Sequence, residues 1–180
     1  MNRESARLAE WSPPAARQPA VEARARLQAL YREHRLDLVR LAVLLVGDRE
    51  TAEDVVQEVF ARLHGRRIEA LTLAYARTCV LNGARSVLRR RAVALRKAER
   101  RVERADSAET AALLGESRRE MLGALGRLPA RQREALVLRF YLDLPEGEIA
   151  RTMGVKESTV RSTTARALAK LQRELGGGKA

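Results

Sequence analysis

PEGEIARTMGVKESTVRSTTARALAKLQREL, residues 145–175, contains two amphipathic segments separated by a glycine. Ile149, Ala150 and Met153 give the first segment one apolar side. Gly154 follows them, at the point where a turn needs a left-handed backbone that glycine adopts most easily. The second segment carries apolar residues that we expect to face the core: Val160, Ala167, Leu168 and Leu171. This layout is that of a helix-turn-helix, whose second helix enters the major groove of DNA.

Polar side chains occupy the opposite face at the start of the second helix. Arg161 can make a paired contact with a guanine, and Glu157 can accept a hydrogen bond from a cytosine amine. Three hydroxyl side chains suit phosphates or base edges, and one more arginine lies a turn further on: Ser158, Ser162, Thr163 and Arg166. A plain solvated face could carry similar residues, but the turn glycine and the local positive charge favour contact with duplex DNA.

The whole chain of 180 residues has the composition of a helical protein. Aromatic residues make up only 3%, whereas sheet-rich folds depend on aromatic and β-branched residues. Ala, Leu, Arg and Glu are abundant instead, and these are strong helix formers. We therefore expect an all-α fold.

Basic residues are concentrated in two blocks of the chain, whose net charge is +12. Residues 1–64 carry 10 basic and 10 acidic side chains, so they are neutral overall. Residues 65–95 carry a net +6, residues 96–120 a net +1, and residues 121–180 a net +5. A general enrichment of arginine would not leave the first block balanced. Two separated basic blocks are typical of a protein that contacts a polyanion twice.

Several classes of site and of protein are disfavoured. A single cysteine, Cys79, excludes an intrachain disulfide or a cysteine-based zinc site. The longest apolar run, from Leu41 to Val46, is far shorter than the ~20 residues of a membrane span. Residues 1–24 also lack the apolar core of a signal peptide. We expect no membrane insertion, no metal and no cofactor, and a reducing cytoplasm suits the chain.

Apolar residues at three- and four-residue steps predict helices along most of the sequence. In the first half we expect helices over about 21–46, 49–64 and 69–91. In the second half we expect helices over about 117–126, 130–142, 146–153 and 157–175. Residues 92–115 alternate in charge and hold few large apolar groups, so they cannot bury much surface.

The predicted organisation is two small helical domains joined by a charged linker. The first domain covers 25–92, the linker 93–116, and the second domain, with the helix-turn-helix, 117–175. Flexible tails are expected at 1–24, which hold three prolines, and at 176–180, which are rich in glycine.

The second predicted helix has a mostly acidic face opposite its apolar stripe. Glu50, Glu53, Asp54, Gln57 and Glu58 form this face. An acidic face within a basic protein suits a basic protein partner better than DNA. Clustered carboxylates also hold Mg²⁺ in nucleases, but the sequence shows no partnering cluster of His or Asp. A solvated face without a partner is the remaining interpretation.

Three stretches in this order resemble one family, the bacterial RNA polymerase sigma factors of the extracytoplasmic-function type within the sigma-70 family. GDRETAEDVVQEVFARLH, residues 47–64, resembles the segment that docks on the polymerase clamp. YARTCVLNGARSVLRRR, residues 75–91, resembles the part that melts and reads the minus-ten promoter element. Residues 125–171 resemble the domain that reads the minus-thirty-five element.

The resemblance implies roles for residues at matching positions. Core-polymerase contacts would be Glu53, Asp54, Gln57 and Glu58. Asn82 matches a position associated with a flipped-out minus-ten base, and an amide can both donate to and accept from a base edge. Arginines would hold the strand backbone by charge: Arg77, Arg85, Arg89, Arg90 and Arg91. Ser86 belongs to the same minus-ten set, although many relatives carry an acid there.

The leading functional hypothesis is a promoter-recognition subunit with no catalytic residue of its own. Its partners would be core RNA polymerase and promoter DNA, with an anti-sigma factor as a further candidate. One alternative is a stand-alone helix-turn-helix regulator, although no dimerisation heptad follows Leu175. Another is a nucleic-acid-processing enzyme that uses the carboxylates of residues 50–58.

Overall fold

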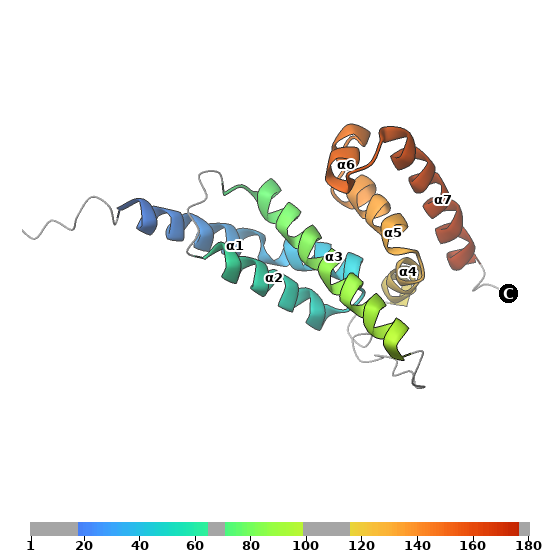
Figure 1. The fold of residues 1–180 in the computed structure, drawn as a ribbon, viewed down its shortest axis with the longest axis horizontal. Coiled ribbons are helices and arrows are strands. Elements are labelled where there is room, and N and C mark those ends of the chain that lie inside the picture. Colours follow the sequence, from blue (N-terminus) through green and yellow to red (C-terminus); the bar gives the residue numbers. More distant parts are fainter. Residues whose placement is uncertain (1–17, 65–70, 99–115, 177–180) are drawn as a thin grey trace, which may run out of the picture.

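The computed structural model describes residues 18–64, 71–98 and 116–176, and every element in these ranges is helical (Figure 1). The first half contains α1 (Gln18–Val46), α2 (Arg49–Leu63) and α3 (Leu73–Ala98). The second half contains α4 (Glu116–Gly126), α5 (Ala130–Leu136), the π-helical turn η2 (Val137–Tyr141), α6 (Glu146–Met153) and α7 (Glu157–Gly176). The prediction of an all-α chain with two helical halves is confirmed.

Some helix bounds differ from those expected. α1 begins at Gln18, within the predicted tail 1–24, and α3 runs from Leu73 to Ala98, into the predicted linker 93–116. The residues that extend α3 are exposed up to Arg96, so helix propensity rather than burial explains the extension. The expected helix 130–142 is divided into α5 and η2. The rest of the first tail, residues 99–115 and residues 177–180 lie outside the described residues.

The first half is a three-helix packing with a close approach between α2 and α3. The predicted apolar stripe of α2 is buried throughout: Ala52, Val55, Val56, Val59, Phe60 and Leu63. A Cβ atom placed on Gly83 of α3 would lie 2.9 Å from Cγ1 of Val55. A side chain at position 83 would therefore force Val55 or one of the two helices to shift.

Asp48 begins α2 as its N-cap. Its Oδ1 accepts a hydrogen bond of 2.8 Å from the backbone N–H of Thr51, and its Oδ2 pairs with Arg91 at 2.8 Å. Burial alone would raise the pKa of Asp48, but the hydrogen bonds from Thr51 and Arg91 hold it below its ordinary value. This carboxylate therefore stabilises the start of α2 in its charged form.

Two arginines from distant elements satisfy the C-terminus of α1, which has no basic residue in its own last turn. Arg91 of α3 donates to the carbonyl oxygen of Val46 at 2.9 Å, and Arg133 of α5 donates to that of Leu45. The last carbonyls of a helix lack partners within the helix and carry partial negative charge. Two cations from elsewhere in the chain thus fix this helix end.

The two halves pack against one another through α1, α3 and the middle of the second half (Figure 1). One cluster of buried apolar side chains extends from the first half to Val137, Leu138 and Ile149. Leu44 of α1 packs against a second cluster, formed by Leu125, Leu128, Leu136 and Ala167. Each half therefore presents apolar surface that the other covers.

Candidate functional site

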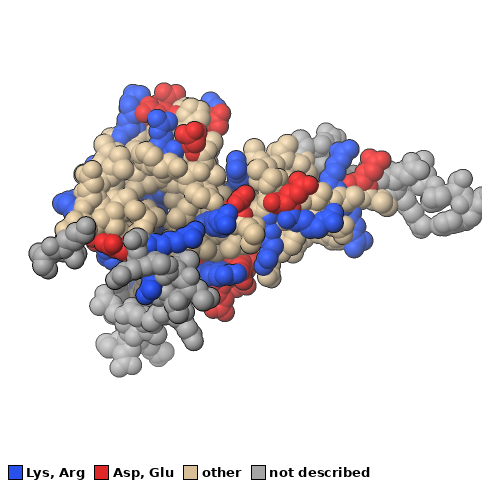
Figure 2. Space-filling view, turned by 180° about the vertical axis from the view of Figure 1, so that it is seen from behind, with Lys and Arg blue, Asp and Glu red and all other residues tan. Residues whose placement is uncertain are grey.

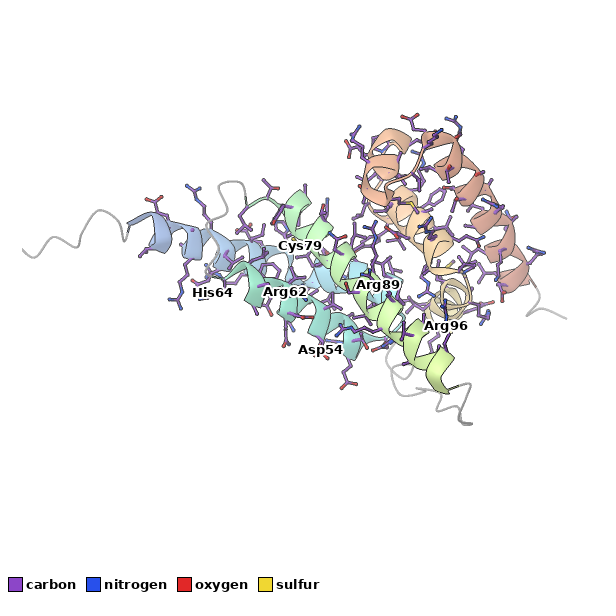
Figure 3. All side chains as sticks on the ribbon, in the orientation of Figure 1. Asp54, Arg62, His64, Cys79, Arg89 and Arg96 are labelled. Atoms are coloured by element: carbon purple, nitrogen blue, oxygen red, sulfur yellow. The ribbon has the colours of Figure 1, made fainter. Side chains whose placement is uncertain are left out.

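The predicted polymerase-binding residues lie on one outward face of α2. Asp54, Gln57 and Glu58 are exposed and Glu53 is partly buried, because the apolar stripe occupies the opposite side of the helix. Arg49 pairs with Glu53 at 2.8 Å. In Figure 3, Asp54 lies on the side of the first half away from α5, α6 and α7. The face is therefore free to meet another protein without disturbing the contact between the halves.

An open groove of about 470 Å³ lies beside this face, between α1 and α2. Tyr31 and Phe60 line it and meet edge to face, with ring centroids 4.9 Å apart. Gln57 belongs both to the groove and to the acidic face. The other lining residues are Leu27, Gln28, Arg32, Ala61 and His64. Sequence reasoning did not identify the groove, because its two walls are about 30 residues apart in the chain.

The predicted minus-ten residues lie along α3, and several of them contact one another. Nη1 of Arg85 donates to Oδ1 of Asn82 at 2.9 Å, and Nη2 of Arg89 donates to Oγ of Ser86 at 3.3 Å. Asn82, Arg89 and Arg90 are exposed, whereas Arg77, Arg85 and Ser86 are partly buried. Figure 3 shows Arg89 where α3 approaches the second half. The structure thus places Arg85 and Arg89 near the junction of the halves, with Asn82 and Ser86 as hydrogen-bond partners on α3.

Arg85 is held by the second half. Its Nε donates to Oε1 of Glu134 in α5 at 3.0 Å, and its Nη2 donates to the same oxygen. Nη2 also donates to the carbonyl oxygen of Thr152 in α6 at 2.8 Å. The Glu134 side chain is only 10% exposed. The guanidinium for which the family resemblance implies a contact with the DNA backbone is therefore paired with a carboxylate of this chain.

Arg91, the last arginine of the predicted strand-binding series, also has internal partners. Besides the carbonyl of Val46 and the carboxylate of Asp48, it donates to Oγ1 of Thr51 at 2.5 Å. Its guanidinium joins α3 to the junction of α1 and α2. Sequence reasoning missed this structural role, because these partners lie 40 or more residues away in the chain.

The helix-turn-helix forms where the sequence predicts it. Gly154 adopts φ 66° and ψ 38°, a left-handed conformation, between α6 and α7. The backbone N–H of Val155 donates to the carbonyl of Ala150 at 3.0 Å, which closes the turn. α7 lies at the edge of the second half, away from α2 (Figure 1). Its first turns are therefore not covered by the first half.

The five predicted minus-thirty-five residues are all exposed on α7: Glu157, Ser158, Arg161, Ser162 and Arg166. Two other expectations for α7 are wrong. Thr163, expected to meet phosphates or base edges, is only 8% exposed and belongs to the core. Leu168, expected to face inward, is 37% exposed. The buried stripe of α7 runs instead through Val160, Thr163 and Ala167, at steps of three and four residues.

Basic and acidic side chains are mixed on one face of the folded chain. Figure 2 shows Lys and Arg side chains across the middle of one face, where the two halves join, with acidic groups among them. Within residues 18–64, 71–98 and 116–176, no three His, Cys, Asp or Glu side chains lie close enough to hold a metal ion. Over the same ranges, no helix combines the length and apolarity that crossing a membrane requires.

Two family models match the chain. Residues 30–94 match the model described as Sigma-70 region 2, and residues 118–171 match the model described as Sigma-70, region 4. The first match covers most of α1 with all of α2 and most of α3, and the second covers the helix-turn-helix with α5 and most of α4.

Curated relatives are similar over most of the chain. The probable ECF RNA polymerase sigma factor SigI of Mycobacterium tuberculosis is 34% identical over 157 residues, covering 81% of this chain and 54% of SigI. The ECF RNA polymerase sigma factor SigL of the same species is 32% identical over 162 residues, covering 83% of this chain and 90% of SigL. The chain therefore spans about half the length of SigI and nearly all of SigL.

Solved structures share the fold. The sigma factor RpoE of Bartonella quintana, in complex with the anti-sigma factor NepR, matches with a TM-score of 0.62 and 23% identity. That match covers 83% of this chain and 98% of RpoE. CnrH, in complex with the cytosolic domain of CnrY, matches with a TM-score of 0.57 and 23% identity, covering 88% of this chain and 96% of CnrH.

Proposed function

Because the chain belongs to the extracytoplasmic-function type of the sigma-70 family, we propose that it is a transcription initiation factor that directs core RNA polymerase to specific promoters. The observation that carries this proposal is the match of both family regions, in order, to the two helical halves of one chain. The subunit contributes recognition and strand opening, and the bond-forming chemistry belongs to the polymerase. It would act in the cytoplasm, where polymerase and promoter DNA meet.

The acidic face of α2 is the proposed polymerase-binding surface. Asp54 and Glu58 are exposed on it, and Gln57 joins it to the neighbouring apolar groove. Protein interfaces commonly combine charge complementarity, which steers association, with an apolar anchor in a pocket, which supplies affinity. A basic partner segment that carries one apolar side chain would satisfy both features.

The two DNA-reading surfaces are proposed to act in sequence. The first turns of α7 would bind duplex DNA in the major groove at the minus-thirty-five element. The Asn82 side of α3 would then hold separated minus-ten bases, with its arginines on the strand backbone, which offsets the cost of unstacking. Arg85 can join that set only when Glu134 releases it.

An anti-sigma factor is a further proposed partner. The similar structures of RpoE and CnrH were both determined with another protein bound, an anti-sigma factor for RpoE. For this chain, the exposed acidic face and groove of α2 offer the same kind of protein-binding surface to an inhibitor as to the polymerase.

The proposal is tested by co-elution of the full chain with bacterial core RNA polymerase in size-exclusion chromatography. The Asp54→Arg plus Glu58→Arg double variant should lose the complex. A control with the same charge change on other exposed helices, Glu22→Arg plus Glu120→Arg, should keep it. No complex with the unchanged, folded chain would overturn the proposal and favour a stand-alone helix-turn-helix regulator. A complex that both double variants retain would remove only the α2 surface from it.

A further inference from the structure

One side chain on the reading face of α7 is fixed from outside its own helix. Nη1 of Arg161 donates to Oε2 of Glu146, at the start of α6, with a distance of 3.0 Å. By contrast, Oγ of Ser162 donates to the carbonyl of Thr159, and Nε of Arg166 donates to the carbonyl of Ser162. Those two side chains lie back along α7. Only for Arg161, among these three, is the direction of the side chain set by the other helix of the helix-turn-helix.

The start of α6 is shaped to come close to this part of α7. A Cβ atom on Gly147 would lie 3.1 Å from Oε1 of Glu157, so the glycine leaves room for that side chain. Glu157 and Arg161 are one helical turn apart on α7. The Arg161 guanidinium is thus directed by the adjoining end of α6, and its side chain remains 59% exposed.

This arrangement leaves the guanine-reading edge of Arg161 available. A guanidinium carries five N–H donors, and guanine recognition uses two parallel donors toward O6 and N7. Glu146 receives its bond from Nη1 alone, so Nε and Nη2 can still face a base. An unrestrained arginine loses rotamer freedom on binding. A side chain that is already oriented loses less rotamer freedom, and it adapts less readily to a different base.

We propose that Glu146 is a positioning residue for promoter reading: it orients Arg161 and so sets the strength of the preference for guanine at one base pair. This inference rests on the proposed function, in which α7 reads duplex DNA. A positioning role for Glu146 and a purely electrostatic role predict different results when the carboxylate is removed. An acid close to DNA repels phosphates on every sequence alike, so its removal should raise the affinity for DNA of any sequence. Loss of the positioning role should in addition lower the preference for guanine at one base pair.

The experiment measures base preference at the minus-thirty-five element with the full chain bound to core polymerase. Duplexes with random bases at that element are selected by binding and then sequenced. Four proteins are compared: the unchanged chain, Glu146→Gln, Arg161→Ala and Glu148→Gln. Glu148 is the matched control, because it lies on the same helix and loses the same charge but contacts Arg151, 4.0 Å away, and not α7. Thermal unfolding by circular dichroism verifies that each variant is folded.

We expect Arg161→Ala to abolish the preference for guanine at one position. Glu146→Gln should lower the preference there by about three- to tenfold, which is only part of the roughly 5- to 150-fold that one paired arginine–guanine contact supplies. Glu148→Gln should leave the preference unchanged. A double variant, Glu146→Gln with Arg161→Ala, should read bases no differently from Arg161→Ala alone.

The outcomes separate the inference from the function it rests on. If Arg161→Ala weakens guanine preference and Glu146→Gln does not, Glu146 has no positioning role, whereas reading by Arg161 stands. If Arg161→Ala changes no base preference, the proposed contact of α7 fails and the inference fails with it. An equal loss in Glu146→Gln and Glu148→Gln would assign the effect to charge, which also overturns positioning.

Discussion

The Arg85–Glu134 contact predicts that one conservative substitution will strengthen the binding of single-stranded DNA. Glu134→Gln keeps the size of the side chain but removes the charge that holds Arg85. In the structure, one carboxylate oxygen receives two N–H donors, with the glutamate side chain 10% exposed and the arginine 34%. Hydrogen bonds to charged groups contribute about 1.5–3 kcal/mol each. Because partial exposure reduces this value, we expect the pair to couple by about 1–2 kcal/mol.

This coupling energy weakens the binding of any partner that must contact Arg85, because the contact with Glu134 has to break first. Since 1.4 kcal/mol corresponds to a factor of about ten, Glu134→Gln should bind a single-stranded oligonucleotide about 5- to 30-fold more tightly. The affinity of the free chain is measured by fluorescence anisotropy at several salt concentrations. Release of one arginine to the strand should also steepen the dependence of affinity on salt by about 0.7 in the log–log slope.

Glu174→Gln is the control for the change in net charge. Glu174 pairs with Arg127 at 2.5 Å and is 26% exposed, within the second half. If both variants gain affinity equally, general electrostatics accounts for the gain. If Glu134→Gln gains nothing and a double-mutant cycle with Arg85→Ala gives less than about 0.5 kcal/mol of coupling in urea unfolding, the contact has no energetic role.

Three further predictions concern stability and are measured by urea unfolding monitored by circular dichroism. Arg133→Met should lower the free energy of unfolding by about 2–4 kcal/mol, because carbonyl oxygens would lose the hydrogen bonds that the buried guanidinium donates. A loss below about 0.5 kcal/mol would contradict a stabilising role for these hydrogen bonds. Gly83→Ala should destabilise the chain by about 1 kcal/mol, since the steric contact with Val55 outweighs the gain in helix propensity. The control is Gly123→Ala, whose added Cβ atom would have its nearest contact 3.5 Å away; this variant should be neutral or stabilising. Equal effects of the two substitutions would refute the steric argument. The pKa of Asp48 is lowered on folding. The contribution of Asp48 to the free energy of unfolding is therefore complete above its unfolded pKa of about 4, and it is lost as the pH falls through the lower pKa of the folded state. Asp48→Asn should accordingly reduce the loss of stability in acid, and an unchanged dependence of stability on pH would contradict this prediction.

The sequence predicts an element well where one side of a helix is buried. The α2 stripe is read correctly because its apolar residues recur at helical spacing. For Thr163, helical spacing predicts burial better than residue type does. Thr163 lies three residues after Val160 and four before Ala167, in phase with the buried stripe of α7. Leu168 is one residue, or about 100°, out of that phase and is accordingly exposed.

α5 shows where such reasoning ends. Residues 133–138 are six consecutive buried positions, so the segment has no exposed face and no periodicity to read. The charged pair Arg133 and Glu134 sits within that run, and their partners Leu45 and Arg85 lie 88 and 49 residues away. Contacts at this separation depend on how the two halves meet, which local patterns do not encode. The contact between Glu146 and Arg161, only 15 residues apart, depends instead on the turn between α6 and α7.

The packing of the second half against α3 has a consequence for the distance that the chain can span. In the proposed function, the two promoter elements lie about 25 base pairs apart, which is about 85 Å along the duplex. α3 and α7 are about 39 and 30 Å long at 1.5 Å per residue, and they belong to one packed body in which Glu134 holds Arg85. In the proposed function, we therefore expect the two halves to separate before both elements are bound at once. From Ala98 to Glu116 the chain advances 18 residues, which can extend to about 60–65 Å. In the proposed function, the length of this segment would therefore limit the promoter spacing that the separated halves could bridge.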